Sequence, residues 1–186
     1  ASNKYDLVIT HHPLFFNSIR SIDLRTDIGR IVWTFIKSNT ALFSAHTNLD
    51  VVPDGVNDTL CKAYGFEPKT GEAFDKGFGK WFECSERRLS DLESIMPCRV
   101  AGAKTIDNIN RVGFCGGSGK SIIQELPNKG INVFITGEVG YHDEVFCELN
   151  GIVLILLGHK ESEDPVLPAI KERLLAQFPG IQIDVI

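Results

Sequence analysis

Short apolar runs alternate along this chain with segments in which apolar residues recur at helical spacing. Residues 7–10 form the first run of strand type, and residues 27–38 place large apolar side chains on one helical face. A second strand is predicted at residues 41–45. Asp54 can cap a helix that runs to Tyr64, where Gly65 is a stop signal. This alternation of strands and helices predicts an α/β fold.

The same pattern continues in the second half, after a segment (residues 67–80) that is rich in glycine and charge. We predict a loop or a boundary between lobes in that segment. The expected strands are residues 81–84, 99–103, 111–115, 133–136, 153–157 and 182–185, and the expected helices are residues 90–96, 121–126, 141–150 and 165–178. Pro165 stands at the first turn of the last helix, a position that proline favours.

Bulk composition excludes several classes of protein. The 186 residues are 43% apolar and 23% charged, which is typical of one ordinary domain or two small lobes. The formal net charge is -5 and the basic residues are scattered, so no basic stripe could neutralise phosphates and a nucleic-acid partner is not expected. No apolar run approaches the roughly 20 residues of a membrane-spanning helix, and the first residues do not resemble a signal peptide.

The five cysteines are odd in number and widely spaced, without a C-x-x-C pair. Such cysteines are typical of free, mostly buried thiols in a reducing compartment, so we expect a cytoplasmic protein and no zinc ribbon. The chain reaches a buried-looking strand within a few residues, and its only methionine is Met96. We therefore expect that leading elements of the domain are missing.

All five histidines lie at or just after the carboxyl end of a predicted strand. They are His11 and His12 after residues 7–10, His46 after residues 41–45, His142 after residues 133–136 and a glycine turn, and His159 after residues 153–157. Ligands of open α/β sheets bind at the carboxyl ends of the strands. We therefore expect these side chains to share one rim.

Carboxylates accompany the histidines. Asp50 follows His46 by four residues, and Glu163 follows His159 by four, which is the spacing of one helical face. Imidazole and carboxylate ligands together suit zinc, iron, manganese or a similar divalent ion. The ligands are too many for one tetrahedral ion, so a pair of ions about 3.5–4 Å apart is the favoured interpretation. The alternative for any single histidine is a polar surface residue held by hydrogen bonds.

The adjacent pair His11 and His12 strengthens the metal hypothesis. Neighbouring side chains of a strand point to opposite faces, so both imidazoles can reach one site only if the backbone turns there. Pro13 favours such a turn because it disfavours helical backbone at His12.

The segment GFCGGSGKS, residues 113–121, is similar to a phosphate-binding loop. That loop requires a glycine five residues before the glycine of its Gly-Lys pair, and Phe114 stands at that position. A tight turn from strand to helix is the favoured interpretation. A helix N-terminus that holds an anion stays open as the alternative.

Five motifs together resemble one known family. DLVITHHPLFF, SAHTNLDVVPDGVND, GFCGGSGKSII, ITGEVGYHD and GHKESE occur in the order found in the Nif-three-like family, whose members carry the label GTP cyclohydrolase 1 type 2 homolog. The resemblance spans nearly the whole chain and implies a single, N-terminally incomplete domain, residues 1–186. It implies two related α/β lobes, approximately residues 1–66 and 67–186, the second including a return to the first. A metal site would lie at the carboxyl ends of strands in the cleft between the lobes.

The resemblance also implies site residues, cofactors and assembly. His11, His12, Asp50, His159 and Glu163 match the metal ligands of the family, which imply two divalent metal ions per chain. His46 and His142 match positions that line the same cleft, where they would orient substrate or transfer protons as catalytic residues. Lys160 departs from the family, in which tyrosine or histidine usually follows the histidine of the last motif. Association into toroidal homohexamers is implied as well.

Two functions stay open at this point. One is a metal-dependent hydrolase acting on a small molecule such as a nucleotide or another phosphoester, with Glu163 as the carboxylate between two ions that activate water. The family label implies opening of the imidazole ring of GTP, but no motif indicates recognition of guanine or of a triphosphate. The other is a non-catalytic metal-binding scaffold or regulator that acts through protein partners. An open coordination position would favour catalysis, and a closed ligand shell would favour the scaffold.

Overall fold

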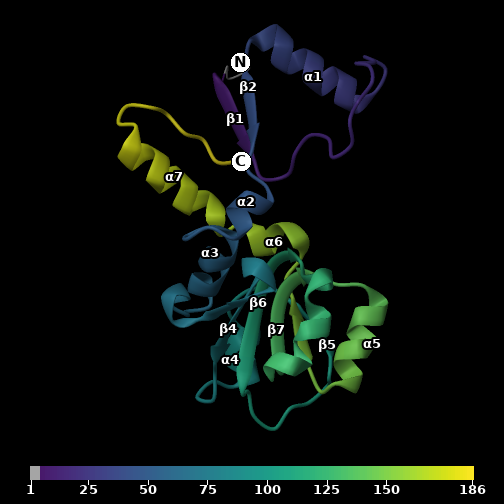
Figure 1. Ribbon diagram of the computed structural model, residues 1–186. Helices are drawn as coiled ribbons and strands as arrows, with labels where there is room; N and C mark the ends of the chain where they lie inside the picture. Colours follow the sequence, from purple (N-terminus) through teal and green to yellow (C-terminus); the bar gives the residue numbers. More distant parts are fainter. Residues whose placement is uncertain (1–4) are drawn as a thin grey trace. The chain divides into compact units, whose positions relative to one another are not determined.

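The computed structural model describes residues 5–186, and the chain forms two compact units (Figure 1). The first unit ends at Leu49 and the second begins at Asp50. The lobes expected from the sequence, residues 1–66 and 67–186, stay a prediction.

The first unit is a β-α-β element. Strands β1 (Leu7–Thr10) and β2 (Ala41–Ser44) pair in parallel, with Leu7 opposite Ala41, and helix α1 (Asp27–Ser38) connects them. The side chain of Thr26 caps α1 by accepting a hydrogen bond of 3.1 Å from the amide of Gly29. The sequence predictions for these three elements are confirmed, with β2 one residue shorter than expected.

The first unit has little core of its own. Among its described residues, Ala45 is the only buried hydrophobic side chain. A groove of about 730 Å³ is lined by residues of α1 and β2, among them Phe35 and Leu42. Large apolar side chains are exposed along the unit: Leu7, Ile9, Phe15, Phe16, Ile28, Ile31, Ile36 and Phe43. The first unit therefore presents an extended apolar surface.

The second unit contains a six-stranded mixed sheet. Its strands, in the order β3-β4-β6-β7-β8-β5, are β3 (Glu72–Phe74), β4 (Gly79–Glu83), β6 (Arg111–Ser118), β7 (Val133–Glu138), β8 (Val153–Leu156) and β5 (Arg99–Gly102). The central strands β6, β7 and β8 are parallel, and antiparallel strands pair with both of their outer edges. The predicted α/β class is confirmed.

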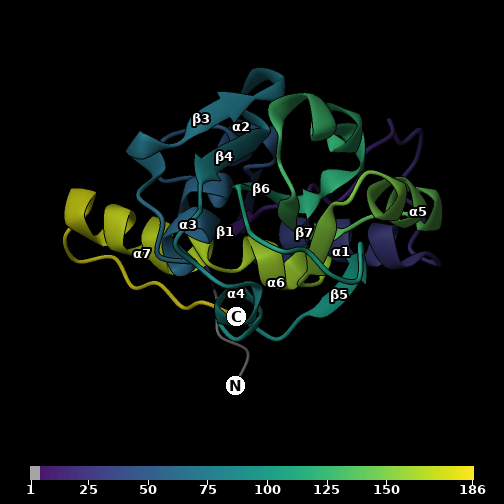
Figure 2. The same ribbon diagram turned by 90° about the horizontal axis from the view of Figure 1, so that it is seen from below.

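Helices and turns cover both faces of this sheet. Val133 and Ile135 of β7 pack in one cluster with Leu60 of α3 (Val56–Ala63), and α4 (Leu89–Glu93) covers the same face. Phe134, between them, packs in a second cluster with Cys147 of α5 (Tyr141–Leu149). Figure 2 shows α3 and α5 on opposite sides of the sheet. The central strands are therefore apolar on both faces, as parallel strands covered on both sides usually are.

Three further helices complete the chain: α2 (Thr47–Asp50), α6 (His159–Glu163) and α7 (Val166–Gln177). Pro165 is the N-cap of α7 and lies one residue before the predicted position. No helix within residues 5–186 combines the length and the apolar character that crossing a membrane requires.

The predicted cap of α3 is wrong. Gly55, and not Asp54, is the N-cap residue, and Asp54 has a positive φ of 58°. The backbone amide of Asp54 donates to the carboxylate of Asp58, at 3.0 Å, and the carboxylate of Asp54 pairs with Lys62. Asp54 therefore ends the loop before the helix and does not cap the helix itself.

Three other predictions differ from the structure. The segment 67–80, predicted as a loop or a boundary between lobes, is not a loop throughout: it contains β3 and the start of β4, because buried Phe74 anchors a short hairpin there. Residues 121–126 form 3-10 turns and no α-helix, and Pro127 removes the amide that would continue a helix. Residues 182–185 pair with no strand among the described residues, and an apolar alternation without a partner does not make a sheet.

Each unit contains one of the two tryptophans. Trp33 lies on α1 and is 45% exposed. Trp81 lies on β4, is 7% exposed, and its ring lies 4.2 Å from the guanidinium carbon of Arg111.

Candidate metal site

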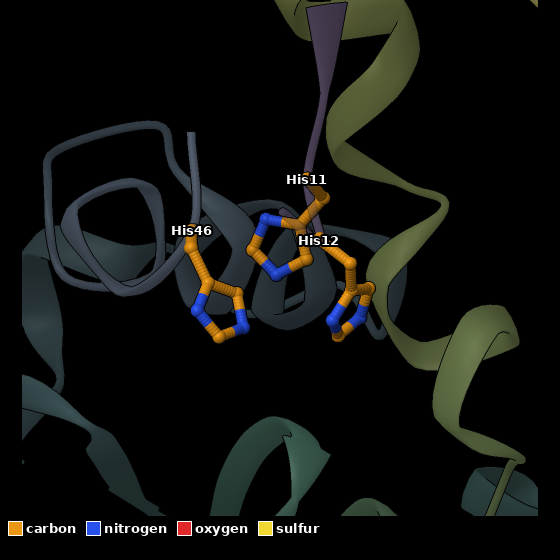
Figure 3. A group of neighbouring side chains, drawn as sticks. All are labelled: His11, His12 and His46. Carbon is orange, nitrogen blue, oxygen red and sulfur yellow. The ribbon is translucent and has the colours of Figure 1, made fainter. Parts of the chain in front are cut away.

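The first unit brings three histidines together. His11 and His12 follow β1, His46 follows β2, and the parallel pairing of these strands puts their carboxyl ends at one edge. The three rings point toward one another in Figure 3, with centroids 5.0 to 5.2 Å apart. One nitrogen of each ring lies within 4.8 Å of the others. The cluster could offer up to three imidazole nitrogens to one divalent ion.

Local hydrogen bonds orient this cluster. Nδ1 of His11 lies 2.7 Å from the carbonyl oxygen of Ala45. A carbonyl only accepts, so Nδ1 carries the proton and the lone pair is on Nε2, the arrangement usual for a metal-binding histidine. The hydroxyl of Thr10 donates to the carbonyl of His12 at 2.8 Å, where β1 ends. The predicted turn after residue 10 is confirmed.

The second unit places His159 and Glu163 at the two ends of α6. Nε2 of His159 lies 3.2 Å from Oε1 of Glu163 across one helical turn. Two ligand atoms about 2.0–2.2 Å from one tetrahedral ion are about 3.4 Å apart, so this separation fits a shared ion. Glu163 is nearly buried, with 12% of its side chain exposed. A buried carboxylate gains from a cation because burial otherwise disfavours its charge.

The end of β6 leaves room for this pair. Gly117 has a φ of +63°, and a Cβ built on it would lie 2.5 Å from Oε1 of Glu163 and 3.2 Å from Nε2 of His159. Gly137 on β7 is equally confined, because its Cβ would meet the carbonyl oxygen of Gly117 at 2.4 Å. Glycine at both positions lets backbone approach the His159–Glu163 pair.

A buried serine ties α6 to that backbone. The hydroxyl of Ser162 accepts from the amide of Gly117 at 2.8 Å and donates to the carbonyl of His159 at 2.8 Å. Ser162 is fully buried, and the hydroxyl of Thr136 donates to the carbonyl of Gly117. The backbone of Gly117 is therefore held through both its amide and its carbonyl.

Asp50 is the last residue of α2 and lies in the electrostatic environment of Cys115 in the second unit. Burial, and to a smaller extent the negative charges of Asp50, Asp75 and Glu163, raise the pKa of the Cys115 thiol to about 12. Asp50 and Glu163 thus both act on one buried thiol. Among residues 5–186, Asp50 belongs to no compact group of ligand atoms, and its role as a ligand stays a prediction.

His142 lies apart from these groups. It is exposed in the first turn of α5, and its ring centroid lies 5.6 Å from that of Tyr141. In the described part of the chain it joins no group of candidate ligands. The strands that the five histidines follow belong to two sheets. The shared rim and a catalytic role for His142 both stay predictions.

The glycine-rich segment 113–121 does not form the predicted turn into a helix. Strand β6 continues to Ser118, and 3-10 turns follow it. The amide of Gly116 donates to the side chain of Asn57, and the amide of Gly117 donates to Ser162. These amides are used within the fold, so the alternative of an anion site at a helix N-terminus loses its structural basis.

Sequence reasoning missed three residues around the site: Gly117, Glu138 and Ser162. Oε1 of Glu138, the last residue of β7, lies 3.0 Å from Nδ1 of His159. A signal existed for Glu138, because it lies two residues after the predicted strand 133–136, just as His159 lies two residues after the predicted strand 153–157. A pocket of about 440 Å³ opens at the same ends of β7 and β8, lined by Glu138, Gly158 and Arg99 among others.

The fold and these side chains define a class of protein. It is an α/β protein that carries candidate divalent-metal ligands, histidines with a carboxylate, just after the carboxyl ends of parallel strands. Both the donor types and their spacing fit a divalent ion.

The family is shown by comparison with known proteins. The Duf34/NIF3 (NGG1p interacting factor 3) family model matches residues 1–186, and the chain belongs to this family. The resemblance derived from the motifs is confirmed.

Relatives agree with this assignment. The "GTP cyclohydrolase 1 type 2 homolog" of Clostridium perfringens is 31% identical over 182 residues, which cover 91% of this chain and 69% of the relative. "NIF3-like protein 1" of Drosophila melanogaster is 30% identical over 85% of this chain and 58% of its own length. The structure titled "Reduced HcgD from Methanocaldococcus jannaschii" superposes with a TM-score of 0.79 at 27% identity, covering 93% of this chain and 71% of that one.

Proposed function

We propose that this protein holds two divalent metal ions and is a metal-dependent hydrolase of a small molecule. The ligands are His11, His12, Asp50, His159 and Glu163, with zinc, iron or manganese as the candidate ions. The observation that carries the proposal is the spacing, typical of metal ligands, within the three-histidine cluster of the first unit and within the His159–Glu163 pair of the second. The names of the relatives support it at the level of the family.

Two bound divalent ions would lower the pKa of a coordinated water toward neutrality and polarise the substrate. The residues of the chain have separate tasks. His11 and His159 present Nε2 because Nδ1 of each is engaged, by Ala45 and Glu138 respectively. Glu163 would hold an ion through its carboxylate, beside Nε2 of His159.

Proton transfer falls to a histidine beside the ions. Imidazole is the side chain best suited to exchange protons near neutral pH. His46 is the stronger candidate because its ring lies against those of both His11 and His12. The same position would let His46 complete the coordination of one ion. His142 is the second candidate for proton transfer.

The substrate is proposed to be a nucleotide or another small phosphoester. Support comes from the family label, which names a GTP cyclohydrolase, and from the pocket of about 440 Å³ beside Glu138, which is large enough for part of such a molecule. The proposed location is the cytoplasm, because its reducing conditions keep thiols free and the five cysteines form no disulfide in the structure.

A homohexamer is part of the proposal. Its support in the structure is the apolar surface of the first unit, since large exposed apolar side chains mark sites of association. Light scattering of the purified chain tests it: a mass near six protomers is expected, and a monomer would contradict it.

The decisive experiment is metal analysis of the purified chain by mass spectrometry, followed by a metal-dependent activity screen with nucleotides and phosphoesters. Two ions per chain are expected, with fewer in His11→Ala and in Glu163→Gln. Fewer than one ion per chain, unchanged in either variant, would exclude the dinuclear centre. The matched control is Glu148→Gln on the exposed side of α5, which should leave the metal content unchanged.

A non-catalytic scaffold is the second candidate. The family description refers to an interacting factor, and the apolar surface of the first unit suits a protein partner. Full metal occupancy without turnover of any tested substrate under any tested divalent ion would favour this scaffold. Turnover that is lost in His46→Ala, with the metal content retained, would favour the hydrolase.

A further inference from the structure

The carboxylates of Glu138 and Glu163 contact the ring of His159 at different nitrogens. Oε1 of Glu138 lies 3.0 Å from Nδ1, and Oε1 of Glu163 lies 3.2 Å from Nε2. The two carboxylates come from different elements, since Glu138 ends β7 and Glu163 ends α6. One imidazole therefore contacts a carboxylate at each of its nitrogens, and only one of the two can share a metal ion with it.

Burial and local geometry decide which carboxylate that is. Glu163 is 12% exposed and lies on the same helical face as His159, whereas Glu138 is 59% exposed. Gly117 opens space beside Nε2 and Glu163, where a Cβ would collide with both. The rigid helical turn and this space favour Nε2 and Glu163 as the ligand pair.

We propose that Glu138 is a positioning residue of the metal site: it accepts the Nδ1–H of His159 and thereby directs Nε2 to the ion. This inference rests on the proposed metal-binding function. Metal-binding histidines commonly donate their second ring N–H to a carboxylate, which fixes the tautomer, orients the ring and raises the basicity of the ligand nitrogen. Ala45 supplies the equivalent acceptor for His11 through its carbonyl.

The test is a titration of the purified full chain with Co²⁺ alone, followed by visible absorption. Removal of a carboxylate in this role weakens metal binding about 10–100-fold, so that loss is expected for Glu138→Ala. Glu138→Gln keeps an oxygen that accepts the Nδ1–H and should retain affinity within about tenfold of the wild type. Glu148→Ala, on the exposed surface of α5, is the matched control and should bind Co²⁺ as the wild type does.

A second measurement reports on the ring itself. In Zn²⁺-loaded protein labelled with ¹⁵N-histidine, the Nδ1–H of His159 should give a slowly exchanging NMR signal in the wild type and in Glu138→Gln. The signal should be lost or broadened in Glu138→Ala. A merely structural role of Glu138 would leave this signal unchanged.

The outcomes separate this inference from the proposed function. If the wild type binds Co²⁺ and Glu138→Ala binds it equally tightly, Glu138 does not position the ligand, although the metal site stands. If Glu138→Gln loses as much affinity as Glu163→Gln, Glu138 is itself a ligand and the inference is wrong. If the wild type binds no Co²⁺, or His159→Ala leaves binding unchanged, the metal site and the role of Glu138 both fail.

Discussion

Gly117 shows how strongly a single residue constrains the candidate site. Its positive φ and the closeness of His159 and Glu163 are separate constraints, because the first is conformational and the second is steric. Gly151 meets only the first constraint, with a φ of +68° and no atom within 4 Å of a built Cβ. The two glycines therefore form a natural matched pair.

Substitution of Gly117 by alanine should weaken metal binding beyond what its loss of unfolding free energy would cause. Both Gly117→Ala and Gly151→Ala should lose roughly 1–2 kcal/mol of unfolding free energy, since each forces an L-residue into left-handed backbone. Only Gly117→Ala should weaken Zn²⁺ binding as well, because its Cβ displaces the carboxylate of Glu163. Urea denaturation and calorimetric titration measure the two effects. Equal Zn²⁺ affinities in the two variants would contradict the steric explanation.

At the scale of elements, α6 is held in place by Ser162. This hydroxyl joins the end of β6 to the start of α6, and both of its partners are backbone atoms. A helix of five residues is too short to be stable through its own hydrogen bonds, so its position depends on such contacts.

Ser162→Ala should destabilise the second unit by about 1–3 kcal/mol, because the amide of Gly117 would be left buried without an acceptor. Ser94→Ala is the matched control. The hydroxyl of Ser94 also donates to a backbone carbonyl, that of Asp91, but the residue is exposed, and a change within about 0.5 kcal/mol is expected. Urea denaturation of both variants checks the difference, and similar losses would contradict the role of burial.

The sequence predicted most elements because their signals are local. β1 and α1 are matched at both ends, since Thr26 caps the helix and the apolar period is regular. β3 was missed because it depends on packing, as buried Phe74 illustrates. The helix predicted at residues 121–126 neglected Pro127, which follows directly and removes the amide that would continue it. The histidine groups follow from strand ends, which can be found in a sequence. Glu138 and Ser162 act through contacts that only the folded chain brings together.

At the scale of the whole molecule, buried thiols couple stability to alkaline pH. Burial raises the pKa of Cys61 from 9.0 to about 12, and it raises that of Cys147 to about 12 as well. The thiol is favoured in the folded state and the thiolate in the unfolded state. The contribution of these thiols to the unfolding free energy is therefore fully present below pH 9 and is lost as the pH rises from 9 toward 12.

Unfolding free energy should accordingly fall by about 1.4 kcal/mol per such thiol between pH 8 and pH 10. Urea denaturation at the two pH values measures the change. Cys61→Ala should show a smaller fall than the wild type, whatever its stability at pH 8. Cys98→Ala removes a thiol that is only partly buried, so this variant should keep most of the fall in unfolding free energy between the two pH values. An identical fall in wild type and Cys61→Ala would contradict this coupling.

Metal ions should stabilise the whole chain if the proposed centre is correct. Free Zn²⁺ at about 100 times its dissociation constant should add about 2.7 kcal/mol to the unfolding free energy, and a chelator should remove it. Thermal denaturation with and without Zn²⁺ measures the effect. The double variant His11→Ala/Glu163→Gln should lose most of the increase, and an unchanged increase would place the bound metal elsewhere.

The two tryptophans give each unit its own intrinsic optical probe. Exposed Trp33 should emit at long wavelength, whereas buried Trp81, beside Arg111, should emit at shorter wavelength and shift on unfolding. Trp33→Phe leaves only Trp81, whose emission reports unfolding of the second unit. Trp81→Phe leaves only Trp33, whose emission reports unfolding of the first unit. The same denaturant series, applied to both variants, follows the two units separately. The cooperativity of the chain is thus open to direct measurement without any attached dye.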